Sequence, residues 1–174
     1  MSENPSYNTI GEVRIVSLPK MFIASYRAIS ITPEADAGRA MDKLIKEYDL
    51  KNKPGFRRFG FNNPDPEPNK AEYGYEMWVS IPEDLEVPEP YVKKEFSGGL
   101  YASIPTYLNS IGERWGQLFE WLKNSEKVEV DWRPESMRHL LEEPLDHSTN
   151  SSGDLDEENF QLDLLVPVNR KQNK

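Results

Sequence analysis

The sequence predicts an α+β protein built from two βαββ units that are related by a pseudo-twofold axis and share one antiparallel sheet. Three observations support this prediction: an alternating strand pattern at residues 73–82, two amphipathic helical stripes, and the same order of elements in both halves of the chain. Both helices are expected on one face of the sheet, with a ligand groove on the other. We expect a single domain over residues 1–174, with the first unit at about 10–83 and the second at about 90–169.

The first unit begins with a strand and a helix. The segment MFIASYRAIS is rich in apolar, β-branched and aromatic residues, which indicates a strand. Thr32 followed by Pro33 is typical of a helix start, and a helix is expected around residues 34–49. Its apolar stripe at helical spacing is Ala37, Met41, Leu44, Ile45 and Tyr48. A second strand, PGFRRFGF, contains Phe59, and a proline-rich loop, NNPDPEPNK, follows it.

The strand YGYEMWVSIP at residues 73–82 has one apolar face and one mixed face. Because side chains alternate between the two faces of a strand, Glu76 and Trp78 must face away from the apolar set. A carboxylate beside an indole suits the wall of a groove, since ligand sites combine apolar surfaces with a few polar groups. The apolar set, which is expected to face the core, is Tyr73, Tyr75, Met77, Val79 and Ile81.

The second unit repeats the order strand, helix, strand, strand. GGLYASIPTY is strand-like, and a helix is expected around residues 110–123, with Ile111, Trp115, Leu118, Phe119 and Leu122 in one apolar stripe. A short strand around MRHLLEE and a closing strand, FQLDLLVPVN, come next. The closing strands of the two units match at their apolar positions, and each ends on a proline. This match places Gln161 and Asp163 on the groove face, as it does Glu76 and Trp78.

Composition excludes several classes of function. The net charge of −9, from 30 acidic and 21 basic residues, has the wrong sign for binding phosphates, so no direct nucleic-acid binding is expected. The chain has no cysteine and only two histidines, and it lacks the common phosphate-loop and dinucleotide motifs, so we expect neither a metal nor a cofactor. No apolar run approaches the roughly 20 residues that cross a bilayer. With no signal-peptide pattern at the N-terminus, a cytoplasmic location without membrane association is expected.

The order and spacing of these segments resemble the GyrI-like small-molecule-binding domains. This family includes the effector-binding modules of multidrug regulators such as BmrR and of AraC-type regulators such as Rob. The matching segments are YGYEMWVSIP, EFSGGLYASI, ERWGQLFEWL, HLLEEPLD and LDLLVPV. The resemblance implies that a glutamate of LEEPLD, either Glu142 or Glu143, lies at the floor of an aromatic pocket. The family pattern has a tyrosine shortly after this glutamate, whereas this chain has Pro144.

The resemblance also extends to a free-standing subgroup, the cyclopropanoid hydrolases, which open the cyclopropane ring of DNA-alkylating compounds with pocket glutamates and aromatic walls. It implies catalytic roles for Glu76, Glu142 and Glu143. The expected ligand-binding residues are Trp78, Trp115, Trp132, Tyr107, Phe59 and Asp163. Four of these residues also have a purely structural interpretation. Glu76 could be a solvated carboxylate on an open face, the Glu142–Glu143 run a solvated surface, and Trp115 a core residue of its helix.

Three classes of function remain open from the sequence. The protein could hydrolyse cyclopropane-bearing toxins, with one groove carboxylate activating water and another assisting at the ligand's carbonyl. Alternatively, it could be a non-catalytic module that sequesters hydrophobic or cationic aromatic drugs, or that serves as an effector-binding domain. The third class is an interaction protein that acts through its acidic surface. Convergence of aromatic residues and carboxylates on one face favours the first two classes, and hydrolysis is the leading expectation.

Overall fold

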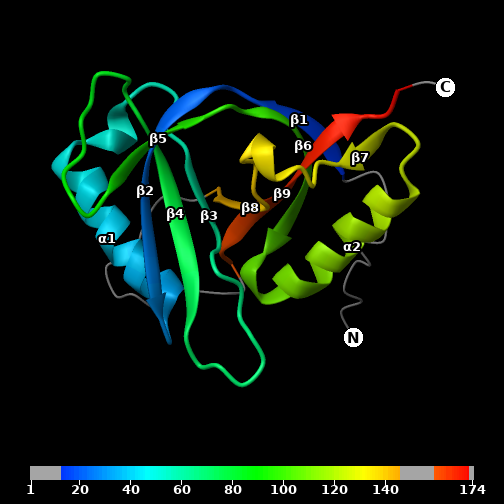
Figure 1. Cartoon of the computed structure of the whole chain (residues 1–174), viewed down its shortest axis with the longest axis horizontal. Helices are drawn as coiled ribbons and strands as arrows, with labels where there is room; N and C mark the ends of the chain where they lie inside the picture. Colours follow the sequence, from blue (N-terminus) through cyan, green and yellow to red (C-terminus); the bar gives the residue numbers. More distant parts are fainter. Residues whose placement is uncertain (1–12, 146–158, 173–174) are drawn as a thin grey trace.

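The computed structural model describes residues 13–145 and 159–172, and it has the α+β architecture that the sequence predicts (Figure 1). The first half contains β1 (Arg14–Leu18), β2 (Met21–Ser30), α1 (Pro33–Glu47), β3 (Arg58–Asn62) and β4 (Tyr73–Ile81). The second half contains β5 (Val92–Phe96), β6 (Gly99–Tyr107), α2 (Ile111–Asn124), β7 (Val128–Val130), β8 (Leu141–Pro144) and β9 (Gln161–Arg170). Short 3-10 turns lie at Leu50–Asn52, Leu108–Ser110 and Pro134–Ser136. No helix in these described ranges is long and apolar enough to cross a membrane.

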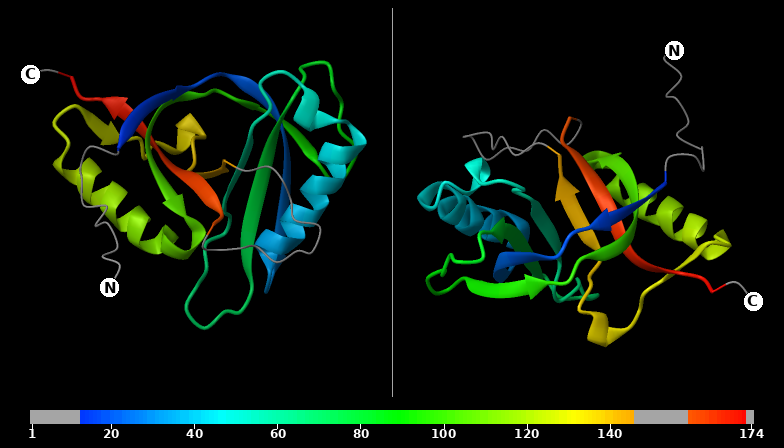
Figure 2. Two further views of the ribbon diagram at one scale, coloured as in Figure 1. Left: turned by 180° about the vertical axis from the view of Figure 1, so that it is seen from behind. Right: turned by 90° about the horizontal axis from the view of Figure 1, so that it is seen from above.

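The strands form one curled antiparallel sheet in the order β1-β6-β9-β8-β3-β4-β2-β5, with β7 paired to β9 (Figures 1 and 2). The halves join at the centre, where Gly60 of β3 lies opposite Glu142 of β8. They also exchange strands at the edges, because β1 pairs with β6 and β5 pairs with β2. The sequence did not predict β1, β5 or β7 as strands. The exchange ties each half to the other at both edges of the sheet.

Both helices cover the same face of the sheet, one over each half (Figure 2). Helix α1 starts at Pro33 and carries acidic residues in its first turn and Lys46 in its last, which complements the helix dipole. Its buried stripe, including Met41 and Leu44, packs on Val79 of β4. Helix α2 packs on the matching strands through Leu118 and Leu122, over Leu162, Leu164 and Val166 of β9. The facing predicted for both closing strands is therefore confirmed.

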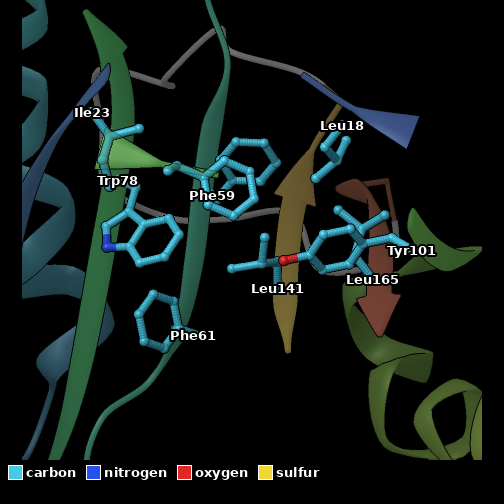
Figure 3. Packing of buried hydrophobic residues seen from close by; sticks show 9 residues of the cluster. Leu18, Ile23, Phe59, Phe61, Trp78, Tyr101, Leu141 and Leu165 are labelled. Atoms are coloured by element: carbon cyan, nitrogen blue, oxygen red, sulfur yellow. The ribbon is translucent and has the colours of Figure 1, made fainter. Parts of the chain in front are cut away.

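The face opposite the helices is filled rather than open. Nine buried side chains from both halves form its central cluster (Figure 3): Leu18, Ile23, Phe59, Phe61, Trp78, Phe96, Tyr101, Leu141 and Leu165. Trp78 is only 4% exposed, and its ring packs edge-on against Phe61 at 5.0 Å between centroids. The exchanged strands β1 and β5 contribute Leu18 and Phe96 to this cluster. The groove expected on this face is therefore corrected to a packed core, which we call the aromatic cluster.

Candidate functional site

Glu142 lies at the junction of the two halves, on the helix-covered face of the sheet. In β8 it follows Leu141, which belongs to the aromatic cluster on the other face, so alternation turns Glu142 towards the helices. Across the ladder it pairs with Leu164, whose side chain packs under α2. On its other side it faces Gly60 of β3. The glutamate therefore lies in the middle of the sheet, between the strands that the two helices cover.

Tyr75 reaches Glu142 across the glycine in β3. Its phenol donates a 2.7 Å hydrogen bond to Oε2 of Glu142. The ring lies directly over Gly60: a Cβ at position 60 would lie 2.2 Å from the Tyr75 hydroxyl oxygen and 2.6 Å from ring carbons. A side chain at position 60 would therefore exclude Tyr75 from its observed position. Glycine at this site is a requirement of the contact between the halves.

Trp115 of α2 is the second aromatic neighbour of this carboxylate, and its indole N–H lowers the pKa of Glu142. Burial raises the pKa of Glu142 above its ordinary value, because the charged form loses hydration. The hydrogen bond from Tyr75 and the nearby indole of Trp115 oppose this rise in the pKa of Glu142, and the charge of Glu34 adds to it. The pKa of Tyr75 is also raised, by burial first and then by the adjacent Glu142 charge.

A second tyrosine–glutamate pair lies beside the first. Tyr73 is two residues before Tyr75 on the same face of β4, and its hydroxyl donates to both oxygens of Glu34, at 2.7 and 2.8 Å. Glu34 belongs to the first turn of α1. Burial and the Glu34 hydrogen bond raise the pKa of Tyr73 to about 12. We call Glu142, Tyr75, Trp115, Tyr73 and Glu34 the helix-face cluster.

Glu76 lies on the opposite face and is saturated with donors. It is 4% exposed. Burial alone would raise its pKa, but donated hydrogen bonds outweigh that effect and lower the pKa to about 2. The donors are Lys94 Nζ at 2.7 Å, Ser25 Oγ at 2.6 Å, Trp78 Nε1 at 2.8 Å and Asn63 Nδ2 at 2.8 Å. These groups come from β2, β4, the β3–β4 loop and the exchanged strand β5, so Glu76 joins three segments of the first half to one of the second.

Glu143 and Asp163 are also on the face opposite the helices, and each has an arginine. Arg57 binds Glu143 through two parallel hydrogen bonds of 2.8 and 2.7 Å. Arg14 binds Asp163 at 3.0 Å. Glu143 and Asp163 are direct cross-strand neighbours, and burial raises the pKa of Asp163 despite the attraction of Arg14. Of the three carboxylates expected to be catalytic, Glu76 and Glu143 therefore lie on one face of the sheet, each paired with a cation of the protein, and Glu142 lies on the other face.

The expected aromatic ligand contacts are also divided between the two faces. Phe59 and Trp78 are buried in the aromatic cluster. Tyr107 lies at the edge of that face, 37% exposed and within reach of Gln161. Trp132 is 68% exposed and stacks on Phe119, which stacks on Trp115 in turn. Of the nine residues that the sequence singled out, Glu142 and Trp115 are the two that meet in the helix-face cluster.

Tyr73, Tyr75 and Glu34 were missed as site residues. The alternation of β4 assigned both tyrosines to the core face, which is correct, but it could not show that their hydroxyl groups would meet carboxylates. Gly60, in a strand of otherwise large residues, was an available signal, because glycine inside a strand often marks the close approach of another group. Within residues 13–145 and 159–172, no group of acidic or histidine side chains has the arrangement of a metal site.

Comparison with protein-family models gives one decisive match. The model of the Cass2 family, described as integron-associated effector binding protein, matches residues 14–168. The chain belongs to this family. The match spans both halves, including all five residues of the helix-face cluster. A comparison with curated protein sequences finds no match.

Solved structures share the effector-binding fold at low sequence identity. The C-terminal domain of EcmrR is 12% identical, with a TM-score of 0.62, and the match covers 91% of this chain and 98% of that domain. A Listeria innocua protein described as a hydrolase is 10% identical, with a TM-score of 0.63 and coverage of 91% and 92%. SAV2435, solved with tetraphenylphosphonium, is 11% identical, with a TM-score of 0.51 and coverage of 91% and 94%. Together with the family match, they confirm the GyrI-like effector-binding fold expected from the sequence.

Proposed function

We propose that this effector-binding protein binds an aromatic cation at the helix-face cluster, with Glu142 as the counter-ion. One observation carries the proposal: Glu142 is a half-buried carboxylate whose hydrogen-bond donor, Tyr75, and neighbouring indole, Trp115, are both neutral. Within the described part of the chain, no lysine or arginine forms an ion pair with it. Glu76 and Glu143, by contrast, each hold a cation of the protein itself.

A desolvated carboxylate without a counter-charge favours either a proton or a bound cation. Removing a carboxylate from water is costly, and the raised pKa of Glu142 records that cost. A lipophilic cation supplies the missing charge, and aromatic faces such as those of Trp115 and Tyr75 attract cations through their π electrons. Because the ionised form binds the cation, affinity should increase as pH rises through the pKa of Glu142. The net charge of −9 also favours approach of cations over anions.

Relatives with the same fold support this ligand class. SAV2435 was solved with tetraphenylphosphonium, an aromatic cation. The family of the chain is itself described as effector binding. The residues that we assign to the ligand come from the helix-face cluster of this chain and not from either comparison.

Calorimetric titration with tetraphenylphosphonium tests the proposal. We expect Glu142→Gln to weaken binding about 10-fold or more, since hydrogen bonds and contacts that involve a charged group are worth roughly 1.5–3 kcal/mol. Glu126→Gln is the matched control, because this exposed glutamate in the α2–β7 turn undergoes the same loss of charge. The control should bind like the unmodified protein. Equal affinity for Glu142→Gln and Glu126→Gln would refute the assignment of the counter-ion.

Hydrolysis of cyclopropane-bearing alkylating compounds is the second candidate function. It is favoured by the raised pKa of Glu142, since a carboxyl group that holds its proton more tightly is better suited to general acid–base catalysis. Two Listeria innocua proteins described as hydrolases share the fold at 10% and 11% identity. In the reaction, water oxygen would bond to a cyclopropane carbon while a ring C–C bond breaks. The released electron pair would move to the conjugated carbonyl, and the proton that the water loses would pass through Glu142 to the carbonyl oxygen.

The position of Glu76 determines which carboxylate would transfer the proton in this reaction. Because Glu76 lies on the other face, we assign proton transfer to Glu142, with Tyr75 hydrogen-bonded to it, in place of the carboxylate pair. Incubation with a cyclopropane-bearing alkylator followed by mass spectrometry distinguishes the candidates. A compound that gains the mass of one water establishes hydrolysis, and its loss in Glu142→Gln assigns the residue. Unchanged compound that co-purifies with the protein indicates binding alone.

A further inference from the structure

We infer that Glu34 is a specificity-determining residue of the helix-face cluster, and that it favours aromatic ligands with two cationic groups over those with one. The inference rests on the proposed function, since it assumes that Glu142 receives the first cationic group. Glu34 is outside the sheet, in the first turn of α1. Its position relative to Glu142 is set by two tyrosines of a single strand.

The spacing of the two carboxylates follows from β4. Tyr73 holds Glu34 and Tyr75 holds Glu142, each through its hydroxyl group. The tyrosines are two residues apart on one face of a strand, and successive same-face positions are separated by about 6.7 Å. The two carboxylates are therefore anchored at successive same-face positions of one strand. They are close enough for the charge of Glu34 to raise the pKa of Glu142.

The surrounding charges leave Glu34 available to a ligand. Arg39 is paired with Asp36, which also accepts a hydrogen bond from Ser30. Arg58 is paired with Asp42 at 2.7 Å. In the described ranges, Glu34 has no lysine or arginine partner, and Tyr73 is neutral. Two carboxylates with neutral partners thus lie side by side, and a second positive charge on the ligand would relieve their mutual repulsion.

The different exposures of Glu142 and Glu34 indicate different roles in ligand binding. Glu142 is half-buried in the middle of the sheet, so a cation there is partly desolvated and less screened than one at Glu34. Glu34 is exposed, so its contribution should be smaller and should depend on salt. The half-buried carboxylate would therefore determine whether an aromatic cation binds. The exposed carboxylate would discriminate between ligands with one charge and ligands with two.

Ethidium and propidium form a matched pair of probes, because they share one phenanthridinium ring and propidium carries a second ammonium group. Their dissociation constants are to be measured by fluorescence with the full chain at low salt. We expect the protein to bind propidium about 3- to 5-fold more tightly than ethidium, as is typical of one exposed ion pair. Glu34→Gln should remove this preference and leave ethidium within 2-fold. The Gln side chain can still accept the Tyr73 hydrogen bond, so the fold should persist, as a thermal melt would verify.

The outcomes separate this inference from the proposed function. Glu142→Gln should weaken both dyes, and Glu126→Gln should preserve the preference for propidium. The preference should also shrink between 0.05 and 0.5 M salt, since exposed pairs are screened. Equal binding of the two dyes, or an unchanged preference in Glu34→Gln, would overturn the role of Glu34 while leaving Glu142 in place. Binding of neither dye would overturn the proposed function and this inference together.

Discussion

Replacing Gly60 by alanine should break the contact between the two halves of the helix-face cluster. The added Cβ would lie 2.2 Å from the Tyr75 hydroxyl oxygen and 2.6 Å from two ring carbons, far inside van der Waals contact. Tyr75 is only 6% exposed, so its ring cannot swing freely into solvent. The ring must move, and the 2.7 Å bond to Glu142 must be lost.

The expected magnitude has two parts. Overpacking a well-packed interior costs about 1–3 kcal/mol. Loss of a hydrogen bond to a charged group costs roughly 1.5–3 kcal/mol. Since the shifted ring relieves part of the overlap, we expect Gly60→Ala to lower the free energy of unfolding by about 2–5 kcal/mol.

Urea unfolding measures this change, and tetraphenylphosphonium binding measures its effect on the site. Tyr75→Phe separates the two contributions, because it removes the hydrogen bond and adds no atom. Gly116→Ala is the control for glycine replacement, since a Cβ at that exposed helix position meets nothing within 4 Å. A Gly60→Ala protein with unchanged stability and unchanged affinity would show that Tyr75 does not require the space above Gly60.

Three further results are expected. Glu76→Gln should destabilise the protein by roughly 1.5–3 kcal/mol, because the donors of Ser25, Trp78 and Asn63 lose a charged acceptor, and unchanged stability in chemical denaturation would show that this network is dispensable. The lowered pKa of Glu76 means that its contribution to stability is complete above its ordinary value of 4.5 and is lost as pH falls towards about 2. Because the pKa of Glu142 is raised, its contribution to the free energy of unfolding declines as pH rises above the ordinary value of 4.5. Glu142→Gln should remove this decline when the free energy of unfolding is measured against pH. Gly116→Ala should stabilise the protein by up to about 1 kcal/mol in urea unfolding, and a loss of stability would contradict the open space around it.

The sequence was sufficient for the elements whose patterns are local. The helices predicted around residues 34–49 and 110–123 are observed at Pro33–Glu47 and Ile111–Asn124. Strand alternation correctly separated Glu76 and Trp78 from the helix-covered face. These features depend on the 3.6- and 2-residue periods of the chain, which are visible without tertiary information.

The sequence was insufficient where distant segments meet. Strands β1 and β5 are short, and their pairing with the opposite half is a long-range property that no local pattern records. Their exchange brings Leu18 and Phe96 onto the face opposite the helices and helps to fill the expected groove. Likewise, alternation showed which way Tyr75 points, but its contact with Glu142 depends on β3 and β8 being neighbours.

Proton release during ligand binding tests the central claim most directly, because a cation that pairs with Glu142 must displace any proton held there. Tetraphenylphosphonium is to be titrated calorimetrically between pH 4.5 and 7 in buffers of different ionisation enthalpy. The account predicts proton release that is largest at low pH, falls towards zero as Glu142 ionises, and is absent in Glu142→Gln. Binding without proton release at every pH, or equal release from Glu142→Gln, would contradict the assignment of Glu142 as the counter-ion.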